Sequence, residues 1–299
     1  MKNAKVLIIL SFIAIYVIWG STYVFNKVAV TELPPFFLAS IRFFTAGCIM
    51  VIIAYFTKAN LKISKQEFKN ICITSFFFLV YGNSVFVWAL QFVDSGFGSL
   101  IASTNPLYVL IMMRIIDRKP MQNKSILGVV LGILGMILLV SQKELTTSKD
   151  SLIGILVMLS CVLSWSYGSI FVSKAKLPKN FLVSTGYQMV IGGVFLAFIS
   201  AIFLESWSSP ISWTTNVQLS MFLLVVFGGI IAFTSFNYLL KVVSPEKVST
   251  SAYVNPVIAL FMGWYFLDET LTLQSVIASV ILLTGVYFIT SRKKIANNK

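Results

Sequence analysis

The residue best suited to chemistry is Arg42, which stands about seven residues inside the apolar segment 35–57. A segment of that length can cross a bilayer, and an arginine at membrane depth costs at least ~2.5–3.5 kcal/mol. The planar guanidinium can bind a carboxylate or a phosphate through two hydrogen bonds. The alternative is a structural arginine that bonds backbone carbonyls or extends to the membrane surface. The sequence leaves both roles open.

Two Asn-Pro pairs are a second polar feature inside apolar segments. Asn105-Pro106 and Asn255-Pro256 fall roughly ten residues from the segment ends, which places them near a bilayer midplane. Proline removes an amide donor and clashes with the carbonyl four residues back, so each pair predicts a kink. The freed carbonyls and the asparagine amides can bind a polar substrate, and the kinks can act as hinges. The alternative is a static kink satisfied by neighbouring serines.

Aromatic and neutral polar side chains gather on a few segments. In segment 70–92, four of them are spaced by 3, 4 and 3 residues and so share one helical face beside Asn83: Tyr81, Ser84, Trp88 and Gln91. Such a lining suits a zwitterionic or amphipathic small molecule. The alternative is ordinary helix packing, with aromatic belts near the membrane surfaces. The other residues predicted to line a substrate pathway are Trp19, Ser21, Tyr23, Trp165, Tyr167, Asn237, Tyr238 and Tyr253.

Groups for catalysis or metal binding are missing from the sequence. It has no histidine, and Cys48, Cys72 and Cys161 show neither metal-ligand nor disulfide spacing. We therefore predict no catalytic residue, no metal site and no cofactor. The ten acidic residues fall at or outside the segment ends, which argues against a proton switch at mid-membrane. Facilitated diffusion, exchange, or coupling through a mouth residue such as Lys27 or Glu32 is expected instead.

Composition determines the elements that position these residues. The chain has 299 residues, of which 58% are hydrophobic and 11% are charged. Soluble domains carry about 25% charged residues. So much apolar surface cannot be buried in a soluble particle of this size. The sequence thus excludes a soluble enzyme, a disordered chain and a disulfide scaffold, and it predicts an all-α polytopic membrane protein.

Ten apolar segments are each long enough, at about 20 residues, to cross a bilayer as a helix. The predicted spans are 6–27, 35–57, 70–92, 96–116, 125–141, 152–173, 182–203, 218–240, 248–267 and 271–290. Of the 23 Lys and Arg residues, 19 fall in one set of alternate loops and the tails. Because positive loops stay cytoplasmic, we expect a multi-pass protein of the cell (inner or plasma) membrane with both termini cytoplasmic. The net charge of +13 therefore indicates orientation and contact with lipid, not nucleic acid.

The chain also contains an internal repeat. The Asn-Pro pair recurs at an offset of 150, and the Trp-x5-Phe pattern of residues 19–25 recurs at residues 165–171. Each copy holds five spans, and because five is odd the second copy must cross the membrane in the opposite sense. We therefore predict two inverted five-helix repeats, 1–141 and 152–290, followed by a basic cytoplasmic tail, 291–299. Inverted repeats are typical of secondary transporters that hold substrate near mid-membrane.

Several motifs resemble the EamA branch of the drug/metabolite transporter superfamily. They are Ile18-Trp19-Gly20-Ser21-Thr22-Tyr23, Pro34-Pro35 leading to Arg42-Phe43, Ser244-Pro245, Tyr253-Val254-Asn255-Pro256-Val257 and Asp268-Glu269-Thr270-Leu271. The resemblance covers nearly the whole chain. It implies a ten-helix permease whose central cavity is lined mainly by spans 1, 3, 4, 6, 8 and 9, with the last span of each half at the periphery. It also implies transport of amino acids and other small metabolites, often outward.

We therefore expect a permease of small polar metabolites that works by alternating access. A multidrug or lipophilic-compound efflux transporter is the alternative within the same class. A membrane enzyme acting on lipids is disfavoured because histidine and paired carboxylates are missing, and a non-transporting scaffold leaves the repeat unexplained. The expected partners are a small-molecule substrate and the lipid bilayer. We expect a monomer, with a homodimer through the small residues Gly128 and Gly132 as the alternative.

Overall fold

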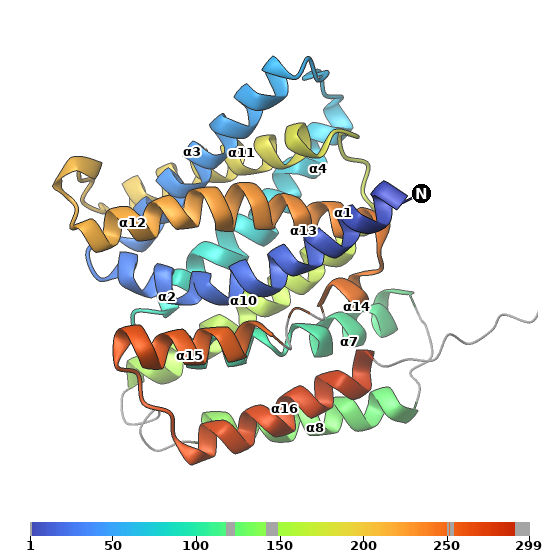
Figure 1. Ribbon diagram of the computed structural model, residues 1–299, viewed down its shortest axis with the longest axis vertical. Coiled ribbons are helices and arrows are strands. Elements are labelled where there is room, and N and C mark those ends of the chain that lie inside the picture. Colours follow the sequence, from blue (N-terminus) through green and yellow to red (C-terminus); the bar gives the residue numbers. More distant parts are fainter. Residues whose placement is uncertain (1, 118–122, 142–148, 250, 252–253, 291–299) are drawn as a thin grey trace, which may run out of the picture.

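The computed structural model describes residues 2–117, 123–141, 149–249, 251 and 254–290. Within these residues every regular element is a helix (Figure 1). Seven helices are long and apolar enough to cross a membrane, and three shorter apolar helices accompany them. These ten helical segments match the ten predicted spans one to one, so the prediction of an all-α bundle of ten helices is confirmed over the described residues.

The first five spans extend from residue 2 to residue 140. Their elements are α1 (Lys2–Ile13), the π-helix η1 (Ala14–Ile18) and α2 (Trp19–Val30) in span 1, and α3 (Pro35–Phe56) in span 2. Span 3 consists of α4 (Lys65–Ser75), the π-helix η2 (Phe76–Val85) and α5 (Phe86–Ala89). Span 4 consists of α6 (Ser95–Ala102) and α7 (Asn105–Asp117), and span 5 is α8 (Asn123–Val140).

The second five spans extend from residue 149 to residue 290. Spans 6 and 7 are α10 (Lys149–Lys174) and α11 (Phe181–Ile202). After the short η3 (Pro210–Ser212), span 8 consists of α12 (Thr215–Leu223), the π-helix η4 (Leu224–Phe233) and α13 (Thr234–Val242). Span 9 includes α14 (Pro245–Val248) and α15 (Asn255–Leu267), and span 10 is α16 (Leu273–Thr290).

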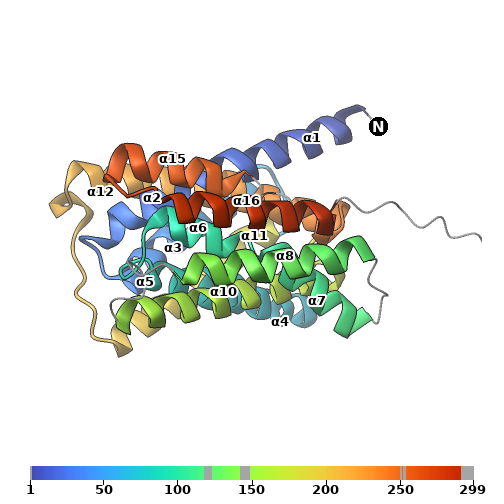
Figure 2. The ribbon, with the colours of Figure 1, turned by 90° about the horizontal axis from the view of Figure 1, so that it is seen from below.

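Two helix pairs lie at opposite edges of the bundle. α3 packs along α11, and α8 packs along α16, so each pair joins helices of the same rank in the two halves (Figure 1; Figure 2). Glycines allow this approach: a Cβ on Gly47 would lie 2.6 Å from the backbone nitrogen of Val190, and one on Gly285 would lie 2.7 Å from the carbonyl oxygen of Gly128. Gly128 and Gly132 thus pack against α16 of the same chain.

The outward faces of the edge helices are apolar. Ile137 of α8 is 60% exposed and Val280 of α16 is 61% exposed, and further large aliphatic side chains flank them. A soluble monomer rarely exposes so large an apolar surface. In a bilayer the same side chains contact lipid tails, while the helices satisfy their own backbone hydrogen bonds. These faces therefore support insertion in a membrane.

The Asn-Pro pairs interrupt spans 4 and 9 where the sequence predicts a kink. α6 ends at Ala102 and α7 begins at Asn105, so Pro106 lies in the first turn of a new helix. Pro256 holds the same position in α15. The first turn tolerates proline because its amides have no partner within the helix. Each pair therefore lies at the start of a new helix within its span.

The π-helix η2 changes the direction of side chains in span 3. In a π-helix each backbone N–H bonds the carbonyl five residues earlier, rather than four. Residues spaced by three and four therefore no longer share one face. Tyr81 bonds Ser160, Asn83 approaches Arg42, and the Ser84 hydroxyl returns to the carbonyl of its own helix five residues back. The single polar face predicted for this span is therefore not what the structure shows.

Candidate substrate site

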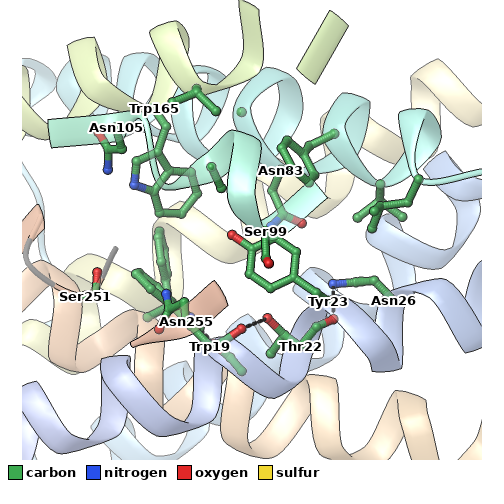
Figure 3. A pocket seen from close by; sticks show the side chains of 18 of the residues that line it. Trp19, Thr22, Tyr23, Asn26, Asn83, Ser99, Asn105, Trp165, Ser251 and Asn255 are labelled. Atoms are coloured by element: carbon green, nitrogen blue, oxygen red, sulfur yellow. Dashed lines mark hydrogen bonds between the residues drawn. The ribbon is translucent and has the colours of Figure 1, made fainter. Parts of the chain in front are cut away.

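A central cavity is lined by helices from both halves of the chain (Figure 3). The cavity volume is about 120 Å³, which is enough for several waters. Its polar lining consists of Thr22, Tyr23, Asn26, Arg42, Asn83, Ser99, Ser103, Asn105, Ser251 and Asn255. Its aromatic lining consists of Trp19, Phe43, Phe86, Trp165, Phe233 and Phe236. The site thus combines hydrogen-bonding groups with flat apolar surfaces.

Arg42 lies in the wall of this cavity, about two turns inside α3. Its side chain is 3% exposed, and Nη1 donates to Asn26 Oδ1 at 3.0 Å and to Asn83 Oδ1 at 3.4 Å. The guanidinium carbon lies 4.8 Å from the centre of the Phe43 ring, which is close enough for a cation–π interaction. Arg42 is therefore held by neutral groups from spans 1, 2 and 3.

Aromatic rings from spans 1, 3, 6 and 8 pack together on another side of the cavity. Trp19 and Trp165, which the repeat relates, meet edge to face with centroids 5.6 Å apart. Phe236 lies 4.8 Å from Trp19, and Phe78 lies 4.8 Å from Trp165. Edge-to-face and tilted packing of this kind is favourable for aromatic side chains. Both halves contribute to this aromatic cluster, so relative movement of the halves must rearrange it.

The two asparagines of the Asn-Pro pairs bind the first helix of the opposite half. Asn105 accepts a hydrogen bond from the Ser166 hydroxyl of α10 at 2.7 Å. The partners around Asn255 orient its amide nitrogen toward the carbonyl oxygens of Ile15, at 3.2 Å, and Tyr16, at 2.8 Å. Ile15 and Tyr16 belong to the π-helix η1. Asn105 and Asn255 therefore hold the helix breaks in position beside the cavity.

The structure brings together part of the predicted pathway. The predicted residues that line the cavity are Trp19, Tyr23, Arg42, Asn83, Asn105, Trp165, Asn255 and Pro256. Ser21 bonds the Ile18 carbonyl, and Pro106 is buried without lining the cavity. Tyr253 and the predicted tail, 291–299, lie outside the described residues.

The remaining predicted residues lie away from the cavity. Tyr167 packs on Phe77 at 4.7 Å between ring centroids, and Tyr238 packs on Phe181 at 5.1 Å. Asn237 is buried against α11, where its Nδ2 donates to Gln188 Oε1 and Thr185 Oγ1. Tyr81 bonds Ser160 at 3.0 Å. Trp88 lines a separate open groove with Glu32 and Glu205. These side chains were predicted from residue type and spacing, and tertiary packing determines their partners.

Sequence reasoning missed polar lining residues on span 1. Thr22 and Asn26 line the cavity together with Trp19 and Tyr23. The four positions are spaced by 3, 1 and 3, which is the spacing of one helical face. The periodicity of residues 19–26 therefore contained a signal for both residues. Ser99 and Ser251, which also line the cavity, carry no comparable signal.

At one end of the bundle, glutamates of one half cap helices of the other half. Glu205 accepts from two backbone amides in the first turn of α3, at 3.1 and 2.7 Å, and Glu269 accepts from two at the start of α6, at 2.7 and 3.0 Å. Glu32 accepts from the backbone amide and the hydroxyl of Thr214, the residue before α12. Carboxylates are stabilising at helix N-termini. We call this region, defined by Glu32, Glu205 and Glu269, the glutamate end; it lies at the left of Figure 1.

Two further charged groups lie at the glutamate end. Lys27 donates to the carbonyl oxygens of Leu90 at 2.6 Å and Val93 at 2.9 Å. Asp94 is partly buried and lies near Glu269. Burial and the negative charge of Glu269 raise the pKa of the Asp94 carboxyl, and the positive charge of Lys27 partly opposes this shift. Asp94 therefore holds a proton more readily than an exposed aspartate does.

Comparison with protein families decides the class of protein. The EamA-like transporter family matches residues 6–141 and 152–291, which together make up nearly the whole chain. The chain belongs to the EamA-like transporter family. Family membership makes it a membrane transporter, and it confirms the resemblance carried by the sequence motifs.

Two bacterial transporters are among the relatives of this EamA-like transporter. The chain is 31% identical over 286 residues to an uncharacterized inner membrane transporter, YedA, of Escherichia coli (strain K12), covering 94% of this chain and 89% of the relative. It is 26% identical over 295 residues to an uncharacterized transporter, YoaV, of Bacillus subtilis (strain 168), covering 96% and 99%. A protein crystal structure at 16% identity superposes with a TM-score of 0.71 over 96% of both chains, which shows a shared fold alone.

The cavity of this EamA-like transporter agrees with the arrangement implied by the resemblance. Spans 1, 3, 4, 6, 8 and 9 all contribute lining residues, and α8 and α16 contribute none of those described. Span 2 is an addition, because Arg42 and Phe43 also reach the cavity. The family and the geometry therefore indicate the same central site.

Proposed function

We propose that the chain is a permease of the plasma membrane that moves small polar metabolites, such as amino acids or related compounds, by alternating access. The observation that carries this proposal is the central cavity, which polar side chains and a buried arginine line inside an apolar bundle. A pocket with a few placed polar groups among apolar walls is typical of small-molecule binding. Membership of a transporter family supports the same function.

Element lengths support an organisation as two inverted repeats, residues 1–141 and 152–290. α3 and α11 both have 22 residues, α7 and α15 have 13, α8 and α16 have 18, and η2 and η4 have 10. Two halves with five spans each would cross the membrane in opposite senses. Rocking of such halves about the cavity would open it to each side in turn.

The distribution of charge supports an orientation for this permease. The loops and tails that hold 19 of the 23 basic residues would face the cytoplasm, together with both termini. The glutamate end would then be extracellular. The bilayer would be its main partner besides the substrate, and the permease would act as a monomer without a metal, a cofactor or a catalytic residue.

The charges at the cavity favour a transport mode without a mid-membrane proton switch. No carboxylate belongs to the described residues that line the cavity, and proton relays through membranes normally need Asp, Glu or His. We propose facilitated diffusion or exchange, with coupling through Lys27 or Glu32 as the alternative. A substrate-driven pH change in proteoliposomes that survives neutralisation of every acid at the mouths would contradict the coupling alternative.

The test of the proposed function begins with untargeted metabolite profiling of cells with and without the gene. Compounds that change are then offered to the purified protein in proteoliposomes, with empty liposomes as the control. We expect one or a few small polar metabolites to be transported. Transport of apolar drugs in their place would favour lipophilic efflux, and no transport of any changed compound would favour a scaffold; either result would overturn the proposal.

A further inference from the structure

Arg42 carries a positive charge in the cavity wall without a counter-charge. The side chain is 3% exposed, and no acidic group among the described residues acts on it as a partner. The described acids lie at or near helix ends, whereas Arg42 lies about two turns inside α3. A buried charge without a partner is strongly unfavourable. Such a residue in a membrane protein commonly marks the path of a ligand of opposite charge.

The hydrogen-bond donors of Arg42 are incompletely used. Nη1 donates to the side-chain oxygens of Asn26 and Asn83, but the buried Nε has no partner. Nη2 lies beside Gly228, where a Cβ would be 3.4 Å away. Asn26 is itself fixed, because its Nδ2 donates to the Thr22 carbonyl at 2.8 Å. These contacts differ from a structural arginine, which would bond backbone carbonyls or extend to the membrane surface.

Flat apolar groups lie within the same cavity. In Figure 3, Trp19 and Trp165 lie on one side of the pocket, and Asn26 and Asn83 lie on the other. The indole nitrogen of Trp19 already donates to the Gly228 carbonyl at 3.4 Å, so its ring is left as an apolar surface. A ligand between these groups would meet a cation at one end and aromatic faces at the other.

We propose that the transported substrate carries an anionic oxygen group, a carboxylate or a phosphate, that binds Arg42, and an apolar part that packs against Trp19 and Trp165. A guanidinium binds either oxyanion through charge-assisted hydrogen bonds, and Arg42 lines the cavity. The anion also supplies the negative charge that balances Arg42 in the cavity wall. This inference rests on the proposed function, because it takes the central cavity to be the transport site.

The test is equilibrium binding to the purified full-length protein in detergent. The probes are benzoate, phenyl phosphate, benzylamine and benzyl alcohol, which share a ring and differ in the attached group. Binding is read from quenching of tryptophan fluorescence and from the thermal unfolding midpoint. We expect benzoate or phenyl phosphate to bind roughly tenfold or more tightly than the amine and the alcohol, and the stronger of the two identifies the oxyanion. Equal binding of all four probes would overturn the proposal.

Substitutions of Arg42 and of the control residue Lys241 locate the binding site. Arg42→Gln should weaken binding of the preferred anion by roughly tenfold or more, and Arg42→Lys should retain part of it. Lys241→Gln is the matched control, because it also removes one positive charge, but Lys241 donates to the Ala175 carbonyl away from the cavity. Anion binding that is unchanged in Arg42→Gln would overturn the proposal.

Asn83→Asp keeps the test decisive if Arg42→Gln fails to fold. The new carboxylate would lie at the present position of the Asn83 amide, 3.4 Å from Nη1, and would supply the missing counter-charge. We expect a higher unfolding midpoint together with loss of anion binding. An unchanged midpoint with intact anion binding would overturn the proposal, because the charge of Arg42 would then already be satisfied.

Binding and transport separate this inference from the proposed function. A protein that binds the anions selectively but transports nothing in proteoliposomes would retain the inferred site and overturn only the permease. A protein that transports cationic or neutral metabolites as well as anionic ones would retain the permease and overturn only the inference.

Discussion

A charged side chain near a bilayer must find a partner within the protein or remain at the membrane surface, because an isolated charge is costly in an apolar medium. Lys27 bonds two carbonyl oxygens at the end of span 3. The three glutamates bond backbone amides of the opposite half. Asp94 differs, because its neighbour Glu269 has the same charge. At the residue scale, Asp94 is therefore a carboxyl whose ionisation is disfavoured by its surroundings.

Replacing Asp94 with asparagine should raise the free energy of unfolding at neutral pH. Burial and Glu269 raise the pKa of Asp94, with Lys27 opposing them. A raised pKa in the folded state means that the folded protein binds this proton more tightly than the unfolded chain does. The Asp94 carboxyl therefore stabilises the fold at acidic pH and loses that contribution as the pH rises above about 4.

Thermal unfolding of the wild type and Asp94→Asn between about pH 4 and pH 8 checks the ionisation of Asp94. Asparagine resembles the neutral carboxyl at every pH, so the difference in unfolding midpoint should widen as the pH increases. A difference that is the same at every pH would contradict the raised pKa.

At the scale of elements, close contact between α3 and α11 depends on glycine. Gly47→Ala should lower the free energy of unfolding by roughly 1–3 kcal/mol, because the added Cβ would lie 2.6 Å from the Val190 nitrogen and 2.8 Å from the Gly186 oxygen. Both atoms are backbone and cannot move without separating the helices. Gly132→Ala is the matched control, since its Cβ would meet only Leu107 Cδ2 at 3.6 Å. Equal unfolding midpoints in detergent for the two variants would contradict this packing.

The helix breaks of spans 4 and 9 should matter for movement. Pro106→Ala and Pro256→Ala should each slow transport turnover more than they weaken substrate binding, because alanine supplies an amide that allows the helix to continue through the break. Turnover and binding constants measured in proteoliposomes separate these effects. Pro210→Ala is the control, since Pro210 begins the short exposed η3 and should leave turnover unchanged. Normal turnover in both of the other variants would contradict a hinge.

Sequence patterns predicted the spans better than the site. Each crossing requires about 20 apolar residues, and this requirement is visible in composition. The helical face of residues 19–26 was also present as a periodicity. The directions of the Tyr81 and Trp88 side chains could not be predicted from the sequence. The reason is that η2 is π-helical, and residue spacing does not report which backbone hydrogen bonds form. Asn237 bonds Gln188 of α11 rather than a substrate, which is a choice made by tertiary packing.

At the scale of the whole molecule, the glutamate end joins the two halves of the chain. The three glutamate caps all join one half to the other. Beneath them, Leu33 and Trp213 come from different halves and are buried in one apolar cluster, at 2% and 7% exposure. Val87 belongs to this cluster and also lines the cavity. In the proposed alternating access, opening the cavity at this end would require the caps and the cluster to separate.

Removing one of these caps should favour the open state at the glutamate end. In Glu205→Ala, two amides of α3 lose their acceptor, which costs the closed state roughly 0.5–2 kcal/mol. That cost corresponds to roughly 2- to 30-fold more open protein. The reporter is Met221→Cys, 4% exposed in the same apolar cluster, in a background without native cysteines. Its labelling by a membrane-impermeant maleimide should accelerate by the same factor.

Glu67→Ala is the matched control for the loss of a helix cap. Glu67 caps α4 through a reciprocal capping box with Ser64, so its hydrogen bonds stay within one half. Its removal should leave the labelling of Met221→Cys unchanged, because it costs the open and closed states the same free energy. Equal acceleration in both variants would indicate a general loosening of the fold, and the glutamate caps would then have no specific part in alternating access.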